Sequence, residues 1–231
     1  MALNYETIAK MIDHSLLQPP LTDQELEAGC RLAAEYQVAS VCIKPYFVRR
    51  AAELLRGSSV AVGTTVGFPH GGHETEVKVQ EAQIAVEEGA TELDMVCNIG
   101  KVLSEDWDTV AKDIEAVLRV ARDSGAVLKV IFENCYLDQR HKIQLCRLCT
   151  ELGVDFVKTS TGYGPGVATL SDVKLMREHA GPQVQVKAAG GIRSLDALLE
   201  MRTAGASRIG ASRTAQILDD LKERLVRESA P

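Results

Sequence analysis

Short apolar runs alternate with longer amphipathic segments along the whole chain, and this alternation constrains the fold more than any other feature. The apolar runs have the length and the β-branched content of strands. They cover residues 12–17, 38–43, 60–66, 92–96 and 127–132, then the run that ends at Lys158, then 184–187 and 208–209. The segments between them predict helices over 22–36, 46–55, 74–88, 106–124, 138–152, 171–179 and 195–204, with a last helix from about 214.

Eight strands that alternate with eight helices are typical of a parallel sheet with crossover helices. We therefore expect a closed (β/α)8 barrel of the TIM type, preceded by a short N-terminal helix within Tyr5–Met11. Composition does not change between parts of the chain, so we expect one domain over residues 1–231. An open, doubly wound sheet is the alternative. The first strand, however, is not followed by the G-x-G-x-x-G turn of dinucleotide-binding folds.

Charge and composition exclude several kinds of partner. A net charge of -6 and a pI near 5.5 do not indicate the excess of basic residues that binding to nucleic acid or to an acidic membrane surface requires. The first residues do not resemble a signal peptide, and no apolar run approaches the ~18 residues that span a bilayer. We expect a cytoplasmic protein with six reduced cysteines. Cys146 and Cys149 form a C-x-x-C within a helix, without a second pair. His70 and His73 are too short a constellation for a metal and have no carboxylate pattern around them, so we expect no metal or cofactor.

Strand alternation places charged side chains inside the expected barrel. Side chains of a strand point alternately to the interior and to the helices. The apolar members of each strand are expected to face the helices, which leaves these residues inside: Ser40, Cys42, Lys44, Glu92, Asp94, Lys129, Glu133, Gln185 and Lys187. Buried charges are costly unless they are paired. A structural salt-bridge network is one interpretation, and a polar active-site cavity at the carboxyl ends of the strands is the favoured one.

Lys158 and Lys187 end the sixth and seventh strands, which are neighbours in such a barrel. Adjacent strands lie about 4.8 Å apart, so the two ammonium groups would approach within ~5 Å. Their repulsion, roughly 3 kcal/mol at an effective dielectric of about 20, together with partial desolvation, would lower a lysine pKa from about 10.4 to about 7.5. A neutral lysine attacks a carbonyl to form a Schiff base, and the hydroxyls of Thr159 and Thr161 would orient the carbinolamine. Asp94 is placed to move protons with Lys187, so the pattern suits aldol chemistry without a metal.

Glycine-rich turns follow the seventh and eighth strands, and each leads into a helix. Free backbone N–H groups at such turns bind anions, and the loops after strands seven and eight form the usual phosphate site of this barrel. Either turn alone is also explained by local backbone geometry. The two together predict a phosphate site formed by Gly190, Gly191, Gly210 and Ser212.

At this point the chain resembles the 2-deoxyribose-5-phosphate aldolase family of class I aldolases along nearly its whole length. The motifs that carry the resemblance are Ile12–Leu17, Gly67–Gly71, Glu92–Gly100, Leu128–Glu133, Phe156–Gly162, Val186–Arg193 and Arg208–Ser212. The resemblance implies that Lys158 forms the Schiff base and that Asp94 and Lys187 transfer protons. It also implies reversible cleavage into acetaldehyde and D-glyceraldehyde 3-phosphate, in deoxyribose phosphate breakdown. The expected substrate-binding residues are Asp13, Cys42, Lys129, Thr159, Thr161, Gly190, Gly191, Gly210 and Ser212.

Two positions vary within the family pattern or depart from it, and both lie at the expected phosphate end. Tyr163 stands where some members have a lysine, and Arg213 stands where a second serine often follows Ser212. Arg213 would either join the phosphate site or point to solvent. We expect a homo-oligomer, a dimer or a tetramer. The competing hypotheses are a sugar-phosphate isomerase or a Schiff-base aldolase for another sugar, and a barrel that binds a metabolite without catalysis.

Overall fold

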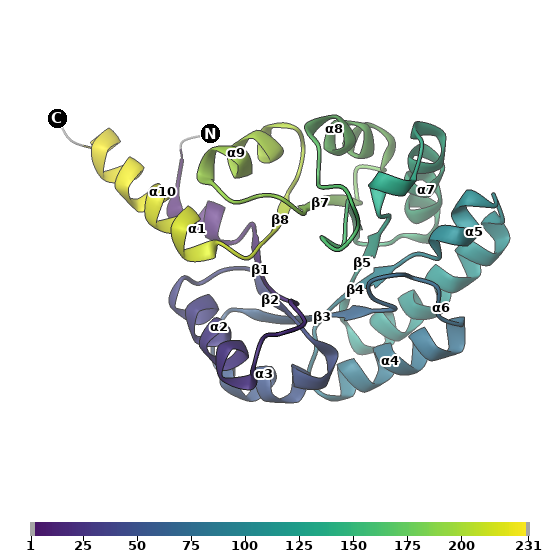
Figure 1. The fold of residues 1–231 in the computed structure, drawn as a ribbon, viewed down its shortest axis with the longest axis horizontal. Helices are drawn as coiled ribbons and strands as arrows, with labels where there is room; N and C mark the ends of the chain where they lie inside the picture. The colour runs from purple at the N-terminus through teal and green to yellow at the C-terminus, as the bar shows by residue number, and fades with distance from the viewer. Residues whose placement is uncertain (1–2, 230–231) are drawn as a thin grey trace.

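The computed structural model describes residues 3–229, and its strands form one closed parallel barrel (Figure 1). The strands follow one another around the barrel in chain order, and β8 closes it by pairing with β1. Their bounds are β1 Ile12–Leu16, β2 Ser40–Ile43, β3 Ala61–Val66, β4 Glu92–Val96, β5 Val127–Ile131, β6 Phe156–Lys158, β7 Gln185–Ala189 and β8 Arg208–Ala211. The predicted (β/α)8 barrel is confirmed, and the open-sheet alternative is excluded.

Helices surround the barrel on the outside (Figure 1). Their bounds are α1 Tyr5–Ala9, α2 Asp23–Glu35, α3 Val48–Leu54, α4 Thr75–Glu87, α5 Ile99–Leu103, α6 Trp107–Ser124, α7 Gln139–Leu152, α8 Leu170–His179, α9 Leu195–Thr203 and α10 Thr214–Ser229. Two 3-10 turns, η1 Pro45–Phe47 and η2 Asn134–Tyr136, precede α3 and α7. The expected N-terminal helix is α1.

Local sequence signals set several helix starts. The Thr22 side chain accepts from the backbone N–H of Glu25 and the Glu25 carboxylate accepts from that of Thr22, so α2 begins with a complete capping box. Asp138 caps α7 by accepting from the N–H of His141. Replacing a cap of this kind by alanine typically costs about 1 kcal/mol.

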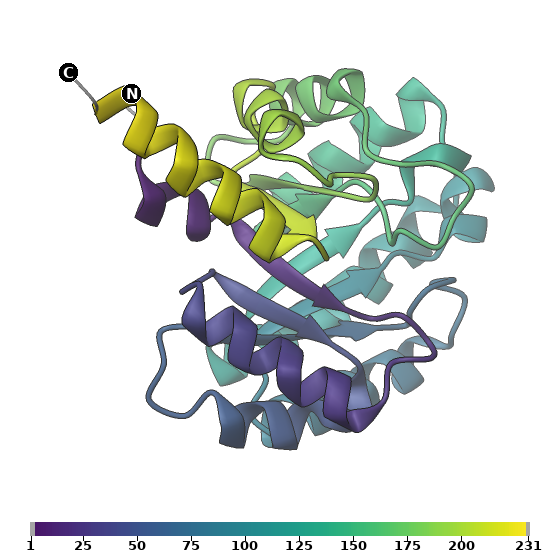
Figure 2. The same ribbon diagram turned by 60° about the vertical axis from the view of Figure 1, so that its left-hand side comes forward.

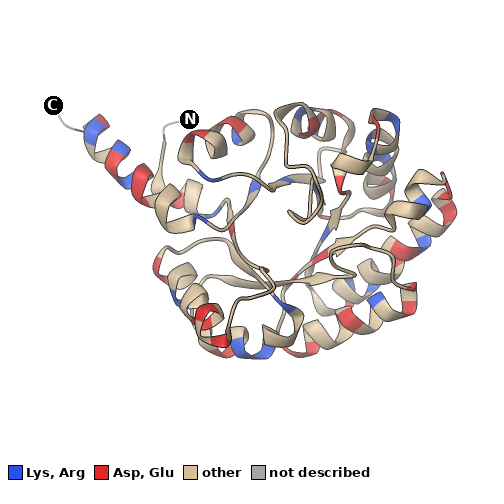
Figure 3. Cartoon of the chain, in the orientation of Figure 1, with Lys and Arg blue, Asp and Glu red and all other residues tan. Residues whose placement is uncertain are grey.

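The apolar core lies between the strands and the helices. Val41, Leu93, Val130 and Val186, all on the expected helix-facing side of their strands, are fully buried there. Truncating a buried leucine such as Leu93 to alanine typically costs about 2–5 kcal/mol. The barrel interior is polar instead, and Figure 3 shows charged positions on the strands inside the ring of helices.

Two side chains depart from the expected alternation: Gln185, the first residue of β7, is exposed, and Lys44 points away from the barrel. Lys44 follows β2 directly, and its Nζ donates to the carbonyls of Pro19 and Leu21 at 2.9 and 3.0 Å, in the loop between β1 and α2. The chain leaves strand geometry at Ile43 because Pro45 begins η1, and the two-residue alternation then no longer applies. The prediction that Lys44 lies inside the barrel is therefore wrong.

The two ends of the described chain pack together. α10 lies along α1 at one edge of the barrel (Figure 2). Inside this contact, Nδ1 of the buried His14 on β1 lies 2.8 Å from the hydroxyl of Thr214, the first residue of α10. No helix within residues 3–229 is both long enough and apolar enough to cross a membrane.

Candidate active site

Two lysines lie side by side where β6 and β7 carry them into the barrel. Lys158, the last residue of β6, pairs in register with Lys187 of β7. Both are almost fully buried, and each Nζ lies 2.6 Å from the same atom, Oδ2 of Asp94 on β4. The expected proximity of the two amines is confirmed, because one carboxylate oxygen contacts both.

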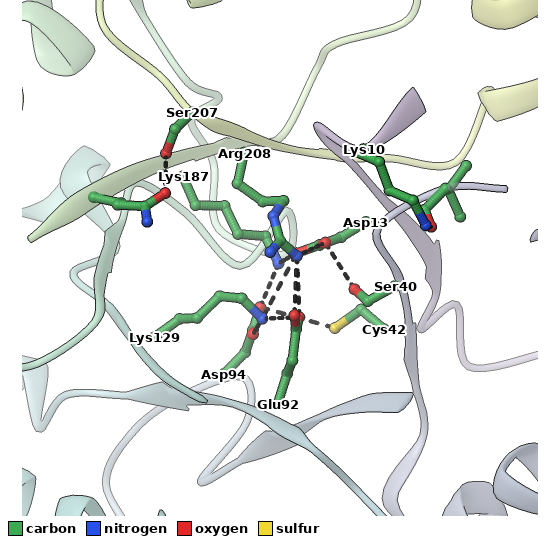
Figure 4. Close-up of polar contacts among 12 residues, drawn as sticks. Lys10, Asp13, Ser40, Cys42, Glu92, Asp94, Lys129, Lys187, Ser207 and Arg208 are labelled. Atoms are coloured by element: carbon green, nitrogen blue, oxygen red, sulfur yellow. Dashed lines mark hydrogen bonds and ion pairs between the residues drawn. The ribbon is translucent and has the colours of Figure 1, made fainter. Parts of the chain in front are cut away.

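A wider network of ion pairs joins Lys187 and Asp94 to further charged side chains (Figure 4). The Nζ of Lys129 lies 2.7 Å from Oδ1 of Asp94 and 2.6 Å from Oε2 of Glu92. Asp13 on β1 contacts Lys187 at 2.5 Å and accepts at 2.7 Å from the hydroxyl of Ser40. The salt-bridge network and the active-site cavity, weighed as alternatives from the sequence, are therefore parts of one arrangement.

The electrostatic environment distinguishes the two lysines of the pair. Burial lowers the pKa of Lys158; the Asp94 carboxylate opposes this shift, the Lys187 ammonium adds to it, and the net direction is downward. Burial also acts against the charge of Lys187, but the carboxylates of Asp13 and Asp94 outweigh it and raise its pKa. The downward direction expected for Lys158 is confirmed, with burial as a larger cause than repulsion between the lysines.

Asp94 remains ionised although it is fully buried. Burial alone would raise its pKa, but Lys129, Lys158 and Lys187 together hold that pKa well below its ordinary value. Cys42 lies beside it, with Sγ 3.9 Å from Oδ2. Burial, reinforced by the Asp94 charge, raises the pKa of Cys42 to about 11, so this residue is a neutral thiol at neutral pH.

A cavity of about 250 Å³ opens above the lysines at the carboxyl ends of the strands. Lys158 and Lys187 lie in its wall, with the two glycine-rich turns after β7 and β8. Of the residues expected at the site, the cavity is lined by Asp13, Cys42, Lys158, Thr161, Lys187, Gly190, Gly191, Gly210 and Ser212. The structure thus brings together most of the expected set in one space.

The remaining residues of the expected set lie behind that wall. Asp94 and Lys129 are buried beneath the lysine pair. The Thr159 hydroxyl is used between strands: it donates to the carbonyl of Ala189 and accepts from its N–H, both at 3.1 Å. This position supports a role in joining β6 to β7 rather than contact with a substrate. Thr161 lines the cavity, and its hydroxyl donates to the buried Glu133 carboxylate.

Backbone geometry explains the glycines at the far end of the cavity. Gly190 and Gly191 have φ values of 96° and 81°, a region that residues with a Cβ rarely adopt. At Gly210, an added Cβ would lie 2.9 Å from the Ala189 Cβ and 3.5 Å from Cε of Lys187. A side chain there would therefore displace the neighbouring strand and the lysine.

The two arginines near this end differ in position. Arg213 is exposed and lies outside the cavity wall, whereas Arg193, in the turn after β7, lines the cavity. Of the two alternatives for Arg213, the structure favours the one that points to solvent. Tyr163 also lines the cavity and packs edge-on against the ring of Phe68, with 5.4 Å between the ring centroids.

Comparison with known proteins agrees with this geometry. The model of the DeoC/LacD family aldolases matches residues 7–217, which include every residue of the site described above. The chain belongs to the DeoC/LacD aldolase family. The deoxyribose-phosphate aldolase of Rhodopirellula baltica is 56% identical to it over 221 residues, which cover 96% of this chain and 92% of that protein. The corresponding protein of Caldanaerobacter subterraneus subsp. tengcongensis is 50% identical over 218 residues, 94% of each chain.

A solved structure resembles this DeoC/LacD aldolase throughout. The deoxyribose phosphate aldolase from Aeropyrum pernix, described as having a unique tetrameric structure, superposes with a TM-score of 0.89 at 32% identity. The match covers 96% of this chain and 93% of that one. The family resemblance inferred from the motifs is therefore confirmed.

Several residues of the aldolase site were not predicted from the sequence. Ser15 and Gln18, at and just beyond the end of β1, line the cavity with Arg193. Arg208 of β8 joins the ion-pair network through Asp13 and Glu92. The signals were present: Ser15 has the same parity as Asp13 on β1, and Arg208 begins the short eighth strand with the parity opposite to that of the apolar Ile209.

Proposed function

We propose that this aldolase reversibly cleaves 2-deoxy-D-ribose 5-phosphate into acetaldehyde and D-glyceraldehyde 3-phosphate through a Schiff base on Lys158. The observation that carries the proposal is a buried lysine of lowered pKa in the wall of a cavity whose far end is formed by the turns after β7 and β8. The deoxyribose-phosphate aldolase names of relatives that match over most of the chain support the same substrate. The reaction belongs to deoxyribose phosphate breakdown.

The first half of the reaction forms the covalent intermediate. The neutral amine of Lys158 attacks C1 of the open-chain aldehyde, and the carbinolamine loses water to become an iminium ion. Asp94 lies 2.6 Å from this nitrogen and from that of Lys187, so it is placed to pass the protons that these steps release and consume. Lys187, which stays charged, is the proton donor of the pair.

The second half breaks the carbon–carbon bond. A base removes the proton of the C3 hydroxyl, the C2–C3 bond breaks, and its electron pair moves into the iminium to give an enamine. Glyceraldehyde 3-phosphate leaves with the new carbonyl. Protonation of the enamine carbon and hydrolysis of the iminium then release acetaldehyde and restore the amine. We assign the proton transfers to Asp94 and Lys187 with a bound water, because these groups surround the Lys158 nitrogen.

We place the phosphate at the two glycine-rich turns. Gly190, Gly191, Gly210 and Ser212 line the cavity that holds Lys158, and we assign the phosphate contacts to their backbone N–H groups and to the Ser212 hydroxyl. Hydrogen bonds to a charged group of this kind contribute roughly 1.5–3 kcal/mol each. Arg193 lines the same end and adds a positive charge.

We also propose that the described chain acts as one catalytic domain and assembles as a homo-oligomer. The relative from Aeropyrum pernix is described as a tetramer. On this chain, exposed apolar side chains gather around a groove between η1 and α4, where Tyr46, Val77 and Ile84 are 63%, 52% and 47% exposed. Light scattering of the purified protein measures the assembly directly. The cytoplasmic location expected from the sequence stays a prediction.

Reductive trapping tests the function. The protein is incubated with acetaldehyde and borohydride, digested and mapped by mass spectrometry, while retro-aldol activity is measured with 2-deoxyribose 5-phosphate. We expect a two-carbon adduct on Lys158, loss of adduct and activity in Lys158→Met, and no adduct on Lys129 or Lys187. An adduct only on another lysine contradicts the assignment. Activity on a different sugar phosphate in a substrate panel favours the isomerase or other-aldolase hypothesis, and a protein without adduct or activity favours the non-catalytic one.

A further inference from the structure

Ion pairs connect a single group of charged side chains inside the barrel. Within residues 3–229, the members of this group are the carboxylates Asp13, Glu92 and Asp94 and the cations Lys129, Lys158, Lys187 and Arg208. If all of them are ionised, the group carries one excess positive charge. If one of the four cations is neutral, the group holds three positive and three negative charges and its net charge is zero. An unbalanced buried charge is costly, so the group favours the loss of one proton.

The contacts of the cations decide which of them is neutral. Arginine does not deprotonate in proteins, which removes Arg208. Lys129 contacts three carboxylates, at 2.6, 2.7 and 3.7 Å, and Lys187 contacts two. Lys158 has a single carboxylate partner and shares the contacted oxygen with Lys187. The proton is therefore held least strongly at Lys158.

Arg208 supplies the positive charge that completes this balance. Its Nη1 lies 2.6 Å from Oδ1 of Asp13 and 3.1 and 3.2 Å from the two oxygens of Glu92 (Figure 4). Its guanidinium lies over the ring of Phe156, 5.3 Å from the centroid, which fixes it from the β6 side. Arg208 thus binds two carboxylates of the group without lying in the wall of the catalytic cavity.

We propose that Arg208 is a positioning residue whose charge, held on Asp13 and Glu92, keeps Lys158 a neutral amine. This inference rests on the proposed Schiff-base role of Lys158. Without the guanidinium, three carboxylates face only Lys129 and Lys187, and Lys158 restores the balance by keeping its proton. A protonated amine has no electron pair for attack on the carbonyl, so the absence of a charge outside the cavity slows the covalent step.

Titratable groups face this network from nearly every side. They are Asp13 on β1, Cys42 on β2, Glu92 and Asp94 on β4, Lys129 on β5, Lys158 on β6 and Lys187 on β7, with Lys10 near Arg208 at the other end of the barrel. Cys42 stays a neutral thiol, as its pKa of about 11 requires. Lys10 donates to Val38 and Ser59 and has no ion pair with the described carboxylates of the network, so it does not replace Arg208.

The pH dependence of labelling at Lys158 tests the proposal apart from catalysis. Acetic anhydride acylates only the neutral amine, and peptide mass spectrometry gives the rate at this one lysine. For Arg208→Gln we expect the midpoint of labelling to move upward by about one pH unit, the effect of one charge at a separation of ~10 Å and an effective dielectric of ~20. The acid limb of the pH profile of acetaldehyde trapping should move upward by the same amount. Arg208→Lys, which keeps the charge, should restore most of the wild-type midpoint.

Two further variants separate charge from damage to the fold. Glu92→Gln removes a negative charge and should move the midpoint downward, while the double variant Arg208→Gln/Glu92→Gln restores the balance and should return it near wild type. Arg177→Gln is the matched structural control. This partly buried arginine donates to the carbonyls of Val184, Ala180 and Gly181, so its loss reduces stability without altering the network.

The possible outcomes are distinct. If folded Arg208→Gln has an unchanged labelling midpoint, the proposal is wrong. This result is expected if Asp13 or Glu92 takes up the proton in place of Lys158. A downward shift of the midpoint in Arg208→Gln also contradicts the proposal. If Arg208→Gln does not fold, an unchanged midpoint in Glu92→Gln contradicts it. If acetaldehyde traps nothing on the unaltered protein, the proposed function fails. The acylation midpoints still report whether Arg208 controls the proton on Lys158, so the two failures are distinguishable.

Discussion

At the scale of single residues, Lys158 and Lys187 show how similar positions acquire different chemistry. Both end up beside Oδ2 of Asp94, and both are buried to the same degree. Only Lys187 has a second carboxylate, Asp13, at 2.5 Å. That contact raises the pKa of Lys187 while burial lowers the pKa of Lys158, so one becomes the proton donor and the other the nucleophile.

Lys187→Leu should therefore slow the enzyme while Lys158 remains present. The pKa of Lys158 rises when the neighbouring ammonium is removed, and burial keeps it below its ordinary value, so the rise is partial. We expect the acid limb of the activity–pH profile to move upward by about one to two pH units, with at least about a tenfold loss of turnover at pH 7. Lys187→Arg retains the charge but cannot donate a proton, so it is the control for the position of the acid limb and not for turnover. A profile that stays in place with near-normal turnover would remove Lys187 from the mechanism.

Asp94→Asn should separate Schiff-base formation from carbon–carbon cleavage. Removing one member of a buried ion pair typically costs about 3–5 kcal/mol, and three lysines contact this carboxylate. The pKa of Lys158 should fall further, because Asp94 opposes its downward shift. Acetaldehyde trapping should persist at a reduced rate while retro-aldol turnover fails, since an amide cannot cycle a proton. Urea unfolding measures the stability, and wild-type turnover in the folded variant would assign the proton transfer to another group, such as Glu133 through water.

At the scale of elements, the turns after β7 and β8 set the preference for a phosphorylated substrate. Arg193 lines the cavity and Arg213 does not, although both follow strand ends. We expect Arg193→Gln to weaken 2-deoxyribose 5-phosphate by about tenfold, about 1.4 kcal/mol, and to leave unphosphorylated 2-deoxyribose almost unaffected. Arg213→Gln is the matched control and should change neither. Equal losses for both sugars in Arg193→Gln would place the phosphate elsewhere.

A substitution in the second turn tests the same element independently. Ser212→Glu places a carboxylate where the phosphate is expected, so repulsion between like charges should act on the phosphorylated sugar alone. Steady-state kinetics on both sugars should show a much larger rise in KM for 2-deoxyribose 5-phosphate. Ser212→Gln, which has the size of glutamate without its charge, controls for bulk. If Ser212→Glu leaves the KM for 2-deoxyribose 5-phosphate unchanged, the phosphate does not bind at Ser212.

Elements with regular patterns could be predicted from the sequence, and those fixed by tertiary contact could not. β4, Glu92–Val96, agrees with its expected bounds because its apolar alternation is unbroken. β8 was expected only over 208–209, since Gly210 and Ala211 have little strand preference; pairing with β1 and β7 extends the strand. The five-residue helix α5 was missed because it is too short to show a helical period.

The same limit applies to the site. Alternation along regular strands placed Cys42, Asp94 and Lys129 correctly inside the barrel, and it failed at Lys44, where the strand had already ended. The partners of Arg208 depend on the register between β8, β1 and β4, which the sequence of one strand does not contain. Thr159 has the residue type expected of a catalytic hydroxyl, but a strand-to-strand hydrogen bond already uses it.

At the scale of the whole molecule, the buried His14 makes the fold sensitive to mild acid. Burial lowers its pKa to about 4, from an ordinary value of 6.5. Between pH 6.5 and pH 4, His14 therefore binds a proton in the unfolded chain but stays neutral in the folded chain. The free energy of unfolding falls as the pH falls through this window. The loss approaches about 3 kcal/mol for one site. The carboxylates Asp13 and Asp94, with their lowered pKa values, lose their contribution only below this range.

Urea denaturation at a series of pH values measures this loss. His14→Asn does not titrate and keeps an amide that can hydrogen-bond to Thr214. Between pH 6.5 and 4, the slope of the unfolding free energy against pH should therefore decrease by the amount that corresponds to about one bound proton. Stability at pH 7.5 should change little by comparison. An unaltered slope in this variant would place the acid sensitivity in other groups.

The pairing of β8 with β1 also has a consequence for protein synthesis. A ribosome adds roughly 5–20 residues per second, and Arg208 emerges only after the other strands that carry charged residues into the barrel. Until then Asp13 and Glu92 lack the guanidinium that they contact in the finished barrel, and β1 lacks its second neighbour. A nascent chain arrested before β8 should therefore remain open to proteases and should not capture acetaldehyde, so that the reactive amine appears only when the barrel closes.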